Sequence, residues 1–333
     1  MHKPRFKGKH YDIGYRQGHF IYKKGIRLEQ YFNLTKAKKE FGIKCIGECG
    51  KVFPEVLEEI KGLADSTKIE YQDFASFIFG MYCFEFTNWC TCFAFKDDTS
   101  LVFGRNSDFA VSLEDQYESA LYNLADGYSF IGNSTAVVQM EDGINEHGLA
   151  IGLTFNNLKV IKPGLNAGIL VRYILEKCKT VQESLEHLTK LPIASAQTLT
   201  IVDKTGDMVV VECNCEKTVV IRPKDNENFV VTANHFVSSE MQQYQDYEER
   251  YAEYRSKDRY QTAYNALKSG RDYSVELAQD ILSGKYGFMC QYDRSRGLDT
   301  VWSSVYDLKN NAIYRAEGNP SRVKFKKDNR LGF

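Results

Sequence analysis

The 333-residue sequence lacks both a dominant charge and a long apolar run. Its 43 lysines and arginines nearly balance 44 aspartates and glutamates, whereas a nucleic-acid-binding protein usually shows a basic excess. No stretch approaches the ~18 apolar residues of a membrane span, and residues 1–19 contain no apolar core of the kind found in a signal peptide. We therefore expect a cytoplasmic protein with neither a membrane nor a nucleic-acid partner.

The nine cysteines form no motif that indicates a disulfide framework or a metal site. Their number is odd and the chain is long, whereas disulfide-rich domains are short and secreted. Cys45 and Cys49 are closely spaced, as are Cys213 and Cys215, but neither pair is joined to a second half that would complete a zinc site. We expect no metal and no cofactor, and predict that most of the cysteines are reduced and buried.

The apolar periodicity changes near residue 89. Before that point, apolar residues recur at helical spacing in the ranges 12–32, 54–66 and 71–86. Gly14 and Gly18 favour a helix that packs closely against a neighbour, although glycine lowers helix stability. We therefore assign residues 1–89 to a helical N-terminal segment and the remaining residues, 90–333, to a second unit.

After Trp89 the sequence is rich in β-branched and aromatic residues, which is typical of strands. Short polar connectors at 96–99, 141–148 and 204–207 indicate antiparallel hairpins. The pattern predicts an α+β fold in which two antiparallel sheets lie between helical layers. The predicted strands are 91–95, 100–105, 135–140, 149–155, 198–203, 208–213, 218–223 and 229–236, with a closing hairpin at 300–318, and the predicted helices are 168–190, 240–270 and 275–284.

One predicted hairpin, in the stretch NWCTCFAFKDDTSLVFGRNSDF, carries Cys90, Cys92, Arg105 and Asp108. Residues two apart on a strand face the same way, so both cysteines could simply line a core. The arginine and the aspartate alone would indicate a surface ion pair of small energetic value. Their combination in one hairpin is what suggests catalytic chemistry.

Seven parts of the sequence resemble the N-terminal nucleophile hydrolases. The hairpin, with Cys90-Thr91-Cys92-Phe93-Ala94 followed by Gly104-Arg105-Asn106-Ser107-Asp108, is similar to that superfamily's nucleophile hairpin. DGINEHGLAIGLTFNN at 142–157, TANHF at 232–236 and SKDRY at 256–260 resemble further motifs in the same order. The family resembled comprises acyl-coenzyme A:6-aminopenicillanic acid acyltransferases, choloylglycine hydrolases and penicillin V acylases. FKGKHYDIGYRQG at the start, with WSSVYDL and AEGNP near the end, points to the acyltransferase-like members with an N-terminal prosegment.

The resemblance implies that the chain cuts itself between Trp89 and Cys90. The Cys90 thiol would attack the Trp89 carbonyl, and water would then release residues 1–89 as a separate prosegment that stays associated. The freed α-amine, with an intrinsic pKa near 7.7–8.0, would act as the general base for the thiol, so that no catalytic histidine is needed.

The resemblance also implies roles for five further residues. Asp108 would hold the new amine, and Arg105 would favour the thiolate. Asn234 would donate to the oxyanion together with Asn156 or the adjacent backbone. Arg259 would complete the polar network. Alternatives remain open: Asn157 or Thr154 for Asn156, Arg255 for Arg259, and Cys92 as the nucleophile, although Thr91 directly after Cys90 favours Cys90.

The leading hypothesis is a cysteine amidase that cleaves the linear amide bond of an N-acyl amino acid or peptide-like small molecule through a Cys90 thioester. An acyltransferase that passes the acyl group to an amine is the alternative, and a non-enzymatic binding protein with the same fold is a third. The 21 Phe and 21 Tyr would suit an aromatic-lined pocket for an apolar acyl group. The sequence leaves a homo-oligomer open.

Overall fold

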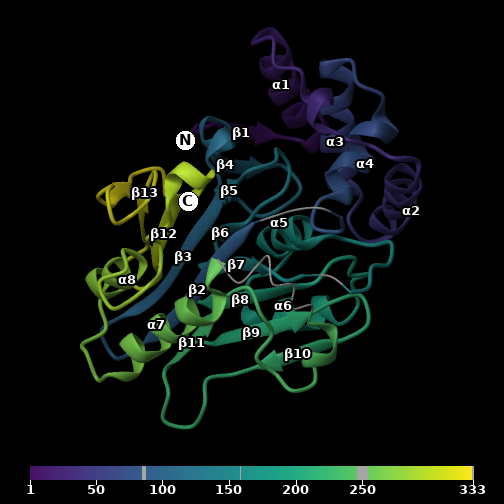
Figure 1. Ribbon diagram of the computed structural model, residues 1–333. Helices are drawn as coiled ribbons and strands as arrows, with labels where there is room; N and C mark the ends of the chain where they lie inside the picture. Colours follow the sequence, from purple (N-terminus) through teal and green to yellow (C-terminus); the bar gives the residue numbers. More distant parts are fainter. Residues whose placement is uncertain (85–87, 158, 246–253, 332–333) are drawn as a thin grey trace.

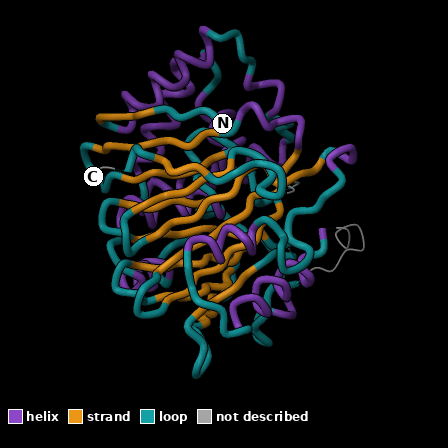
Figure 2. The backbone as a smooth tube through the Cα atoms, turned by 90° about the vertical axis from the view of Figure 1, so that its left-hand side faces the viewer, coloured by secondary structure: helices purple, strands orange, loops and turns teal. Residues whose placement is uncertain are grey.

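The computed structural model describes residues 1–84, 88–157, 159–245 and 254–331 (Figure 1). Two β-sheets pack face to face, with helices on their outer faces and a largely helical N-terminal region at one end (Figures 1 and 2). This arrangement confirms the predicted α+β fold of two sheets between helical layers. No helix in the described ranges is long and apolar enough to cross a membrane.

The larger sheet has eight strands in the order β1-β4-β5-β6-β7-β8-β9-β10. All neighbours pair antiparallel except β1, which pairs in parallel with β4 and so adds a strand from the N-terminal region to the edge of the sheet. Its strands are β1 (Arg5–Gly8), β4 (Glu118–Leu124), β5 (Phe130–Ser134), β6 (Asp142–Asn145), β7 (Leu149–Phe155), β8 (Gln197–Asp203), β9 (Met208–Cys213) and β10 (Thr218–Ile221).

The smaller sheet has six strands in the order β11-β2-β3-β12-β13-β14, all antiparallel. Apolar side chains from the facing sides of the two sheets, among them Cys92, Phe103 and Ile144, form the core between the sheets. Its strands are β11 (Phe229–Thr232), β2 (Trp89–Lys96), β3 (Leu101–Ala110), β12 (Leu298–Asp307), β13 (Ala312–Ala316) and β14 (Lys326–Asp328).

Each sheet is covered on its outer face by a pair of helices. The larger sheet carries α5 (Ala167–Lys177) and α6 (Val181–Leu188), and the smaller carries α7 (Ser256–Lys268) and α8 (Val275–Leu282). Short 3₁₀ helices lie at η1 (Leu28–Tyr31), η2 (Val111–Gln116), η3 (Gln242–Tyr244) and η5 (Arg294–Arg296).

The N-terminal region contains four α-helices that pack against one another and onto α5. Gly14 and Gly18 confirm the predicted close packing, since a Cβ on Gly14 would lie 1.9 Å from the carbonyl oxygen of Glu59 and one on Gly18 would lie 2.1 Å from Ser66 Oγ. The helices are α1 (His10–Lys23), α2 (Lys36–Val52), α3 (Pro54–Thr67) and α4 (Tyr71–Gly80).

A buried group of charges joins this region to the rest of the fold. Arg172 on α5 donates to Glu59 on α3 at 2.7 Å and to Glu176 one turn further along α5. Glu176 in turn contacts the His10 ring at 2.9 Å. All four side chains are buried, so residues before and after Trp89 share one low-dielectric ion cluster.

Several predicted elements differ in the structure. The predicted connector 141–148 contains strand β6, and the helix expected over 12–32 ends at Lys23. Residues 135–140 form a turn with Val137 at φ 42°, because the backbone there bonds to Arg172 and Gly168 instead of a strand. The predicted helix 168–190 is two helices, since Thr180 caps a new start. The predicted helix 240–270 begins at Ser256, and its part 246–253 lies outside the described residues. Strands β4 and β5 were not predicted, because Ser119, Gly132 and Asn133 weaken their strand signal.

Candidate active site

Cys90 lies on β2, a strand of the smaller sheet that is paired with β11 on one side and β3 on the other. Its side chain and that of Cys92 point to the same side of the strand, and both are fully buried. Thr91, between them, points to the opposite side, where Arg259 contacts its hydroxyl. The Cys90 thiol and the Thr91 hydroxyl that Arg259 contacts therefore lie on opposite sides of β2.

Two polar groups contact the Cys90 sulfur. Arg105 Nη2 lies 2.7 Å from Sγ, and the thiol can donate to Asn88 Oδ1 at 3.1 Å. Arg105 comes from β3 and also donates to the Leu153 carbonyl at 3.1 Å. The guanidinium thus links the cysteine to the opposite sheet.

The Arg105 guanidinium is balanced by two carboxylates. Nη2 lies 2.9 Å from Glu141, and Nη1 lies 2.9 Å from Asp142 on β6. Gly152 on β7 makes room for this group, because a Cβ there would lie 3.0 Å from Arg105 Cδ and 2.7 Å from the Phe103 ring. The absence of a side chain at position 152 therefore admits the arginine between the sheets.

Burial decides the protonation state of Cys90 in the uncut chain. It raises the pKa of the thiol well above its usual range, Arg105 lowers that pKa, and Glu141 raises it again. The two carboxylates offset much of the charge of the arginine. The predicted preference of Arg105 for the thiolate is present but is outweighed, and at neutral pH the intact chain holds a protonated thiol.

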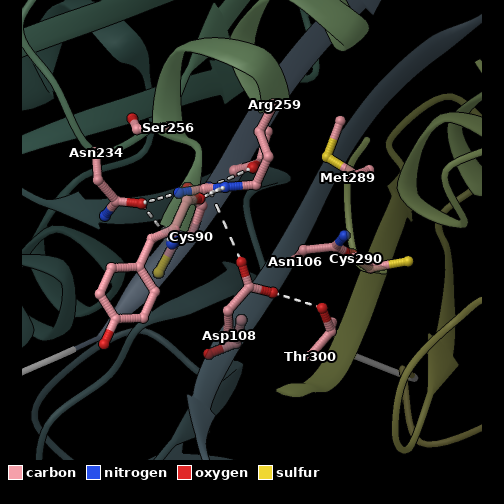
Figure 3. Close-up of polar contacts among 12 residues, drawn as sticks. Cys90, Asn106, Asp108, Asn234, Ser256, Arg259, Met289, Cys290 and Thr300 are labelled. Atoms are coloured by element: carbon pink, nitrogen blue, oxygen red, sulfur yellow. Dashed lines mark hydrogen bonds and ion pairs between the residues drawn. The ribbon is translucent and has the colours of Figure 1, made fainter. Parts of the chain in front are cut away.

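The backbone of Cys90 is held by a second pair of side chains (Figure 3). Its N–H donates to Asn234 Oδ1 at 2.8 Å, and its carbonyl accepts from Arg259 Nη1 at 2.5 Å. Arg259 Nη2 also donates to Asn234 Oδ1 at 2.8 Å. The three residues therefore form a closed set of hydrogen bonds around the residue that would become the new N-terminus.

Arg259, not Arg255, makes this contact. Arg255 is exposed and pairs with Asp258 one turn along α7, at 2.7 Å. His235, next to Asn234, contacts Ser256 Oγ at 2.7 Å, and burial, assisted by Arg259, lowers its pKa to about 4. The histidine is therefore neutral at physiological pH.

The two asparagines expected at an oxyanion site have different surroundings. Asn234 Nδ2 donates to the Phe155 carbonyl at 2.7 Å and approaches the Asn88 carbonyl at 3.4 Å. Asn156 Nδ2 donates to Thr198 Oγ1 at 3.0 Å, on β8. Asn234 is thus brought to Cys90, whereas the Asn156 side chain is bonded to the neighbouring strand β8.

Asp108 lies opposite Trp89 in the pairing of β2 with β3. It accepts from Thr300 at 2.5 Å and from Tyr292 at 2.9 Å, and Arg259 Nη1 lies 3.9 Å away (Figure 3). Burial raises the pKa of this carboxyl, and Arg259 opposes the rise. Asp108 therefore lies beside the peptide bond that the sequence motifs mark for cleavage.

Sequence reasoning missed several members of this network. Glu141 lies one residue before the motif that begins at Asp142, and no role was predicted for either carboxylate. Asp142 is fully buried against Arg105, Trp302 and Tyr306. Asn88, two residues before the cysteine, carries no motif. Alternating strand positions are the only sequence signal for these contacts, and they do not reveal which strand lies opposite.

Among the described residues, no group of three or more His, Cys, Asp or Glu side chains is arranged to hold a metal ion. All nine cysteines are free thiols. The chemistry available at the site is therefore that of a thiol, two arginines, carboxylates and amides.

The fold places two face-to-face sheets between layers of helices, and Cys90 lies on a central strand of one sheet. This is the layered architecture of the N-terminal nucleophile hydrolases. The family model for acyl-coenzyme A:6-aminopenicillanic acid acyl-transferases matches residues 94–322. The chain belongs to that family, as its motifs predicted. The match begins after Cys90, so it does not itself include the cysteine. No curated protein matches the chain.

Three solved structures are similar to this chain. Penicillin V acylase from Agrobacterium tumefaciens is 16% identical over 68% of this chain and 83% of its own, with a TM-score of 0.49. The Caenorhabditis elegans ortholog of N-acylethanolamine-hydrolyzing acid amidase is 16% identical over 66% and 93%, with a TM-score of 0.49. A mutant conjugated bile acid hydrolase from Clostridium perfringens is 14% identical over 72% and 96%, with a TM-score of 0.42.

Proposed function

We propose that the protein is a cysteine amidase that activates itself by cutting the Trp89–Cys90 bond and then cleaves linear amides through a thioester on Cys90. The observation that carries this proposal is the set of contacts around one residue. Arg105 lies 2.7 Å from its sulfur, while Asn234 and Arg259 hold its N–H and its carbonyl. A merely structural cysteine needs none of these contacts.

The proposed self-cleavage is an N-to-S acyl shift followed by hydrolysis. The Cys90 sulfur bonds to the Trp89 carbonyl carbon, the C–N bond breaks, and the thiol proton ends on the leaving nitrogen. Water then attacks the thioester, which yields the Trp89 carboxylate and the free Cys90 thiol and amine. The hydrogen bonds from Asn234 and Arg259 to the Cys90 backbone support this step, because they fix the amine side of the Trp89–Cys90 bond.

In turnover, the freed α-amine would take the thiol proton and the sulfur would attack the amide carbonyl of the substrate. The amine would return that proton to the leaving nitrogen, and water would release the acid. Asn234 Oδ1 is the group that the amine would meet first, at the 2.8 Å separation of the present N–H. Asp108 would supply negative charge behind it, since it lies opposite Trp89 in the strand pairing.

For the oxyanion we propose Asn234 Nδ2 as a donor, which requires its present bond to the Phe155 carbonyl to loosen. Asn156 remains the proposed second contributor, through its side chain or the backbone beside it. One such donor contributes ~2.7–4 kcal/mol to transition-state stabilisation in other acyl-transfer enzymes.

The test is the intact mass of the full chain under denaturing conditions, with Cys90→Ala and Cys92→Ala as a matched pair. Both cysteines are buried on one face of one strand, so their loss costs similar packing. We expect two chains from the wild type and from Cys92→Ala, the larger starting at Cys90, and one chain from Cys90→Ala. A wild type that stays whole, or a Cys90→Ala chain that is cut, contradicts the proposal.

Acyl transfer is the second candidate, because the matched family is described by an acyl-transferase. The two activities diverge at the thioester, where an amine competes with water. Adding a primary amine to a turnover assay separates them. An acylated amine that forms faster than the free acid would favour transfer.

A further inference from the structure

Three exposed apolar side chains gather near the end of α1 and in the segment that follows it. Phe20, Ile26 and Tyr31, which we call the N-terminal patch, are 57%, 44% and 42% exposed. All three also line one cavity of about 860 Å³ between the N-terminal helices and the larger sheet, so the patch forms part of its solvent-exposed wall. Exposed apolar groups around an apolar cavity mark a binding surface.

The cavity is predominantly apolar, with charged residues such as Arg16 and Glu118 also in its lining, and both parts of the chain line it. Phe32, Phe74 and Phe77 come from the N-terminal region, while Phe109, Leu113 and Val137 follow Cys90 in the sequence. Its volume lies within the ~300–1,000 Å³ range of small-molecule sites. Such a space suits a hydrocarbon chain more than a polar ligand.

The inner end of the cavity approaches the candidate active site. Thr135 lines the cavity and donates to Glu141 Oε1 at 2.8 Å. The other oxygen of Glu141 accepts from Arg105 at 2.9 Å, and Arg105 contacts Cys90. One hydrogen-bonded carboxylate therefore separates the cavity wall from the arginine beside the thiol.

The N-terminal segment that carries the patch has an excess of basic residues. Residues 1–50 contain twelve Lys and Arg against four Asp and Glu, whereas the other 283 residues contain 31 against 40. Lys23, Lys24 and Arg27 lie within the patch segment and are exposed, as is Glu29, which pairs with Arg27 at 3.5 Å. Lys24 lies 5.5 Å from the centre of the Phe20 ring. The near-zero net charge of the whole chain hides this asymmetry.

We propose that the N-terminal patch docks on an anionic lipid membrane and that the cavity behind it takes the hydrocarbon chain of a lipid from that membrane. Apolar side chains that enter the interface, combined with cationic ones that meet the headgroups, are how proteins bind to a bilayer without spanning it. The sequence predicted no membrane partner because it contains no spanning segment, and surface docking requires none.

The alternatives fit less well. A two-fold dimer through this patch would bring two basic surfaces against each other. A nucleic acid would use the positive charge but has no use for an apolar opening. If the proposed amidase activity holds, the lipid chain would be the acyl group of the substrate, and this part of the inference rests on that proposed function.

The first test is co-sedimentation of the full chain with vesicles of phosphatidylcholine alone and with a quarter phosphatidylglycerol. We expect binding to the anionic vesicles that weakens on raising salt from 0.1 to 0.5 M, since screening shortens the reach of the charges. The combined change Phe20→Ser, Ile26→Ser and Tyr31→Ser should abolish it. The change Lys23→Gln, Lys24→Gln and Arg27→Gln should weaken it at least ~tenfold.

The matched control replaces three other exposed apolar residues, in the change Val220→Ser, Val237→Ser and Val323→Ser, which should bind as the wild type does. Absence of binding to anionic vesicles, or equal loss in the control and the patch variant, overturns the proposal. So does a wild-type dimer in solution that the patch variant dissociates, or salt-sensitive RNA binding that persists without vesicle binding.

The second test addresses the cavity with cis-parinaric acid, a fatty acid that fluoresces in apolar surroundings. We expect saturable binding by the wild type and its loss in Ala136→Trp, which fills the lined space, while vesicle docking persists. Unchanged parinaric binding in that variant contradicts the cavity assignment. Intact mass measured on the same samples distinguishes the two proposals. Cleavage without vesicle docking contradicts only the membrane-docking proposal, and docking without cleavage contradicts only the amidase proposal.

Discussion

The guanidinium of Arg259 donates to the carbonyl oxygen of Cys90 at 2.5 Å, across 169 positions of sequence. The same side chain holds Asn234 Oδ1, which accepts the Cys90 N–H. One arginine on α7 thus fixes both backbone groups of the residue at the proposed cut. This contact makes Arg259 the most direct target for a test of positioning.

We expect Arg259→Lys to slow self-cleavage at least ~100-fold, because lysine keeps the charge but loses the fork that bonds two partners at once. Arg255→Lys, four residues earlier and exposed, is the matched control and should cleave at the wild-type rate. A time course of intact mass measures both. Equal rates in the two variants would remove Arg259 from the proposed machinery.

Gly152→Ala should slow cleavage by displacing Arg105. A Cβ at this position would lie 2.7 Å from the Phe103 ring and 3.0 Å from Arg105 Cδ, so the guanidinium must shift from the cysteine. We expect a loss of stability of ~1–3 kcal/mol from overpacking and slower cleavage. Gly47→Ala, in open space on α2, should cleave normally and gain up to ~1 kcal/mol. Denaturant titration and intact mass together check the pair.

The buried ion cluster predicts that the two chains stay together after cleavage. Removing Arg172 would leave Glu59 and Glu176 as buried carboxylates without their cation. We expect Arg172→Met to cost ~3–5 kcal/mol and to release the N-terminal chain on gel filtration. Lys177 lies on the same helix as Arg172 and forms a partly exposed ion pair with Glu55. Lys177→Met should leave co-elution of the two chains intact. Co-elution of the cleaved chains in the Arg172 variant would contradict this role.

Glu118 predicts a pH dependence of stability. Burial raises its pKa to about 7 despite the hydrogen bond from Gln17 at 3.0 Å. A folded pKa above the unfolded value means that the stability is fully present below about pH 4.5 and declines as pH rises through 7. The effect is at most about 3 kcal/mol, and smaller because part of the side chain meets solvent.

Glu118→Gln should therefore remove the contribution of this carboxyl to the difference in unfolding free energy between pH 4 and pH 8. Relative to the wild type, the variant should gain stability as pH rises from 4 to 7, and the gain should level off above pH 7. Glu114→Gln, an exposed neighbour in sequence paired with Arg294, serves as the control. Identical pH profiles of wild type and Glu118→Gln would exclude this contribution.

Local patterns predicted the layers of the fold and the two paired strands that carry Cys90 and Arg105. Alternation and short connectors identified β2, β3, β7, β8 and β9, because these features depend on neighbouring residues. Contacts that depend on which elements meet were not accessible. Nothing near Glu141 in sequence indicates that it faces Arg105, and nothing near residues 135–140 indicates that α5 takes their hydrogen bonds.

The same limit applies to the protonation of Cys90. Its arginine neighbour was expected from the motif, but the two carboxylates that compensate the arginine and the full burial of the sulfur are properties of the assembled sheets. The direction in which the Cys90 pKa shifts depends on burial, the arginine and the carboxylates together, so the sequence of the hairpin alone could not predict it.

Strand β1 has a consequence for how this protein can be made. It covers the outer edge of β4, and the helices that follow it cover the apolar face of α5. A recombinant chain that began at Cys90 would expose the β4 edge and that apolar face together, and open edges recruit other strands. Such a product should collect in inclusion bodies, and the same edge and face would need residues 1–89 to stay bound if the proposed cut is made.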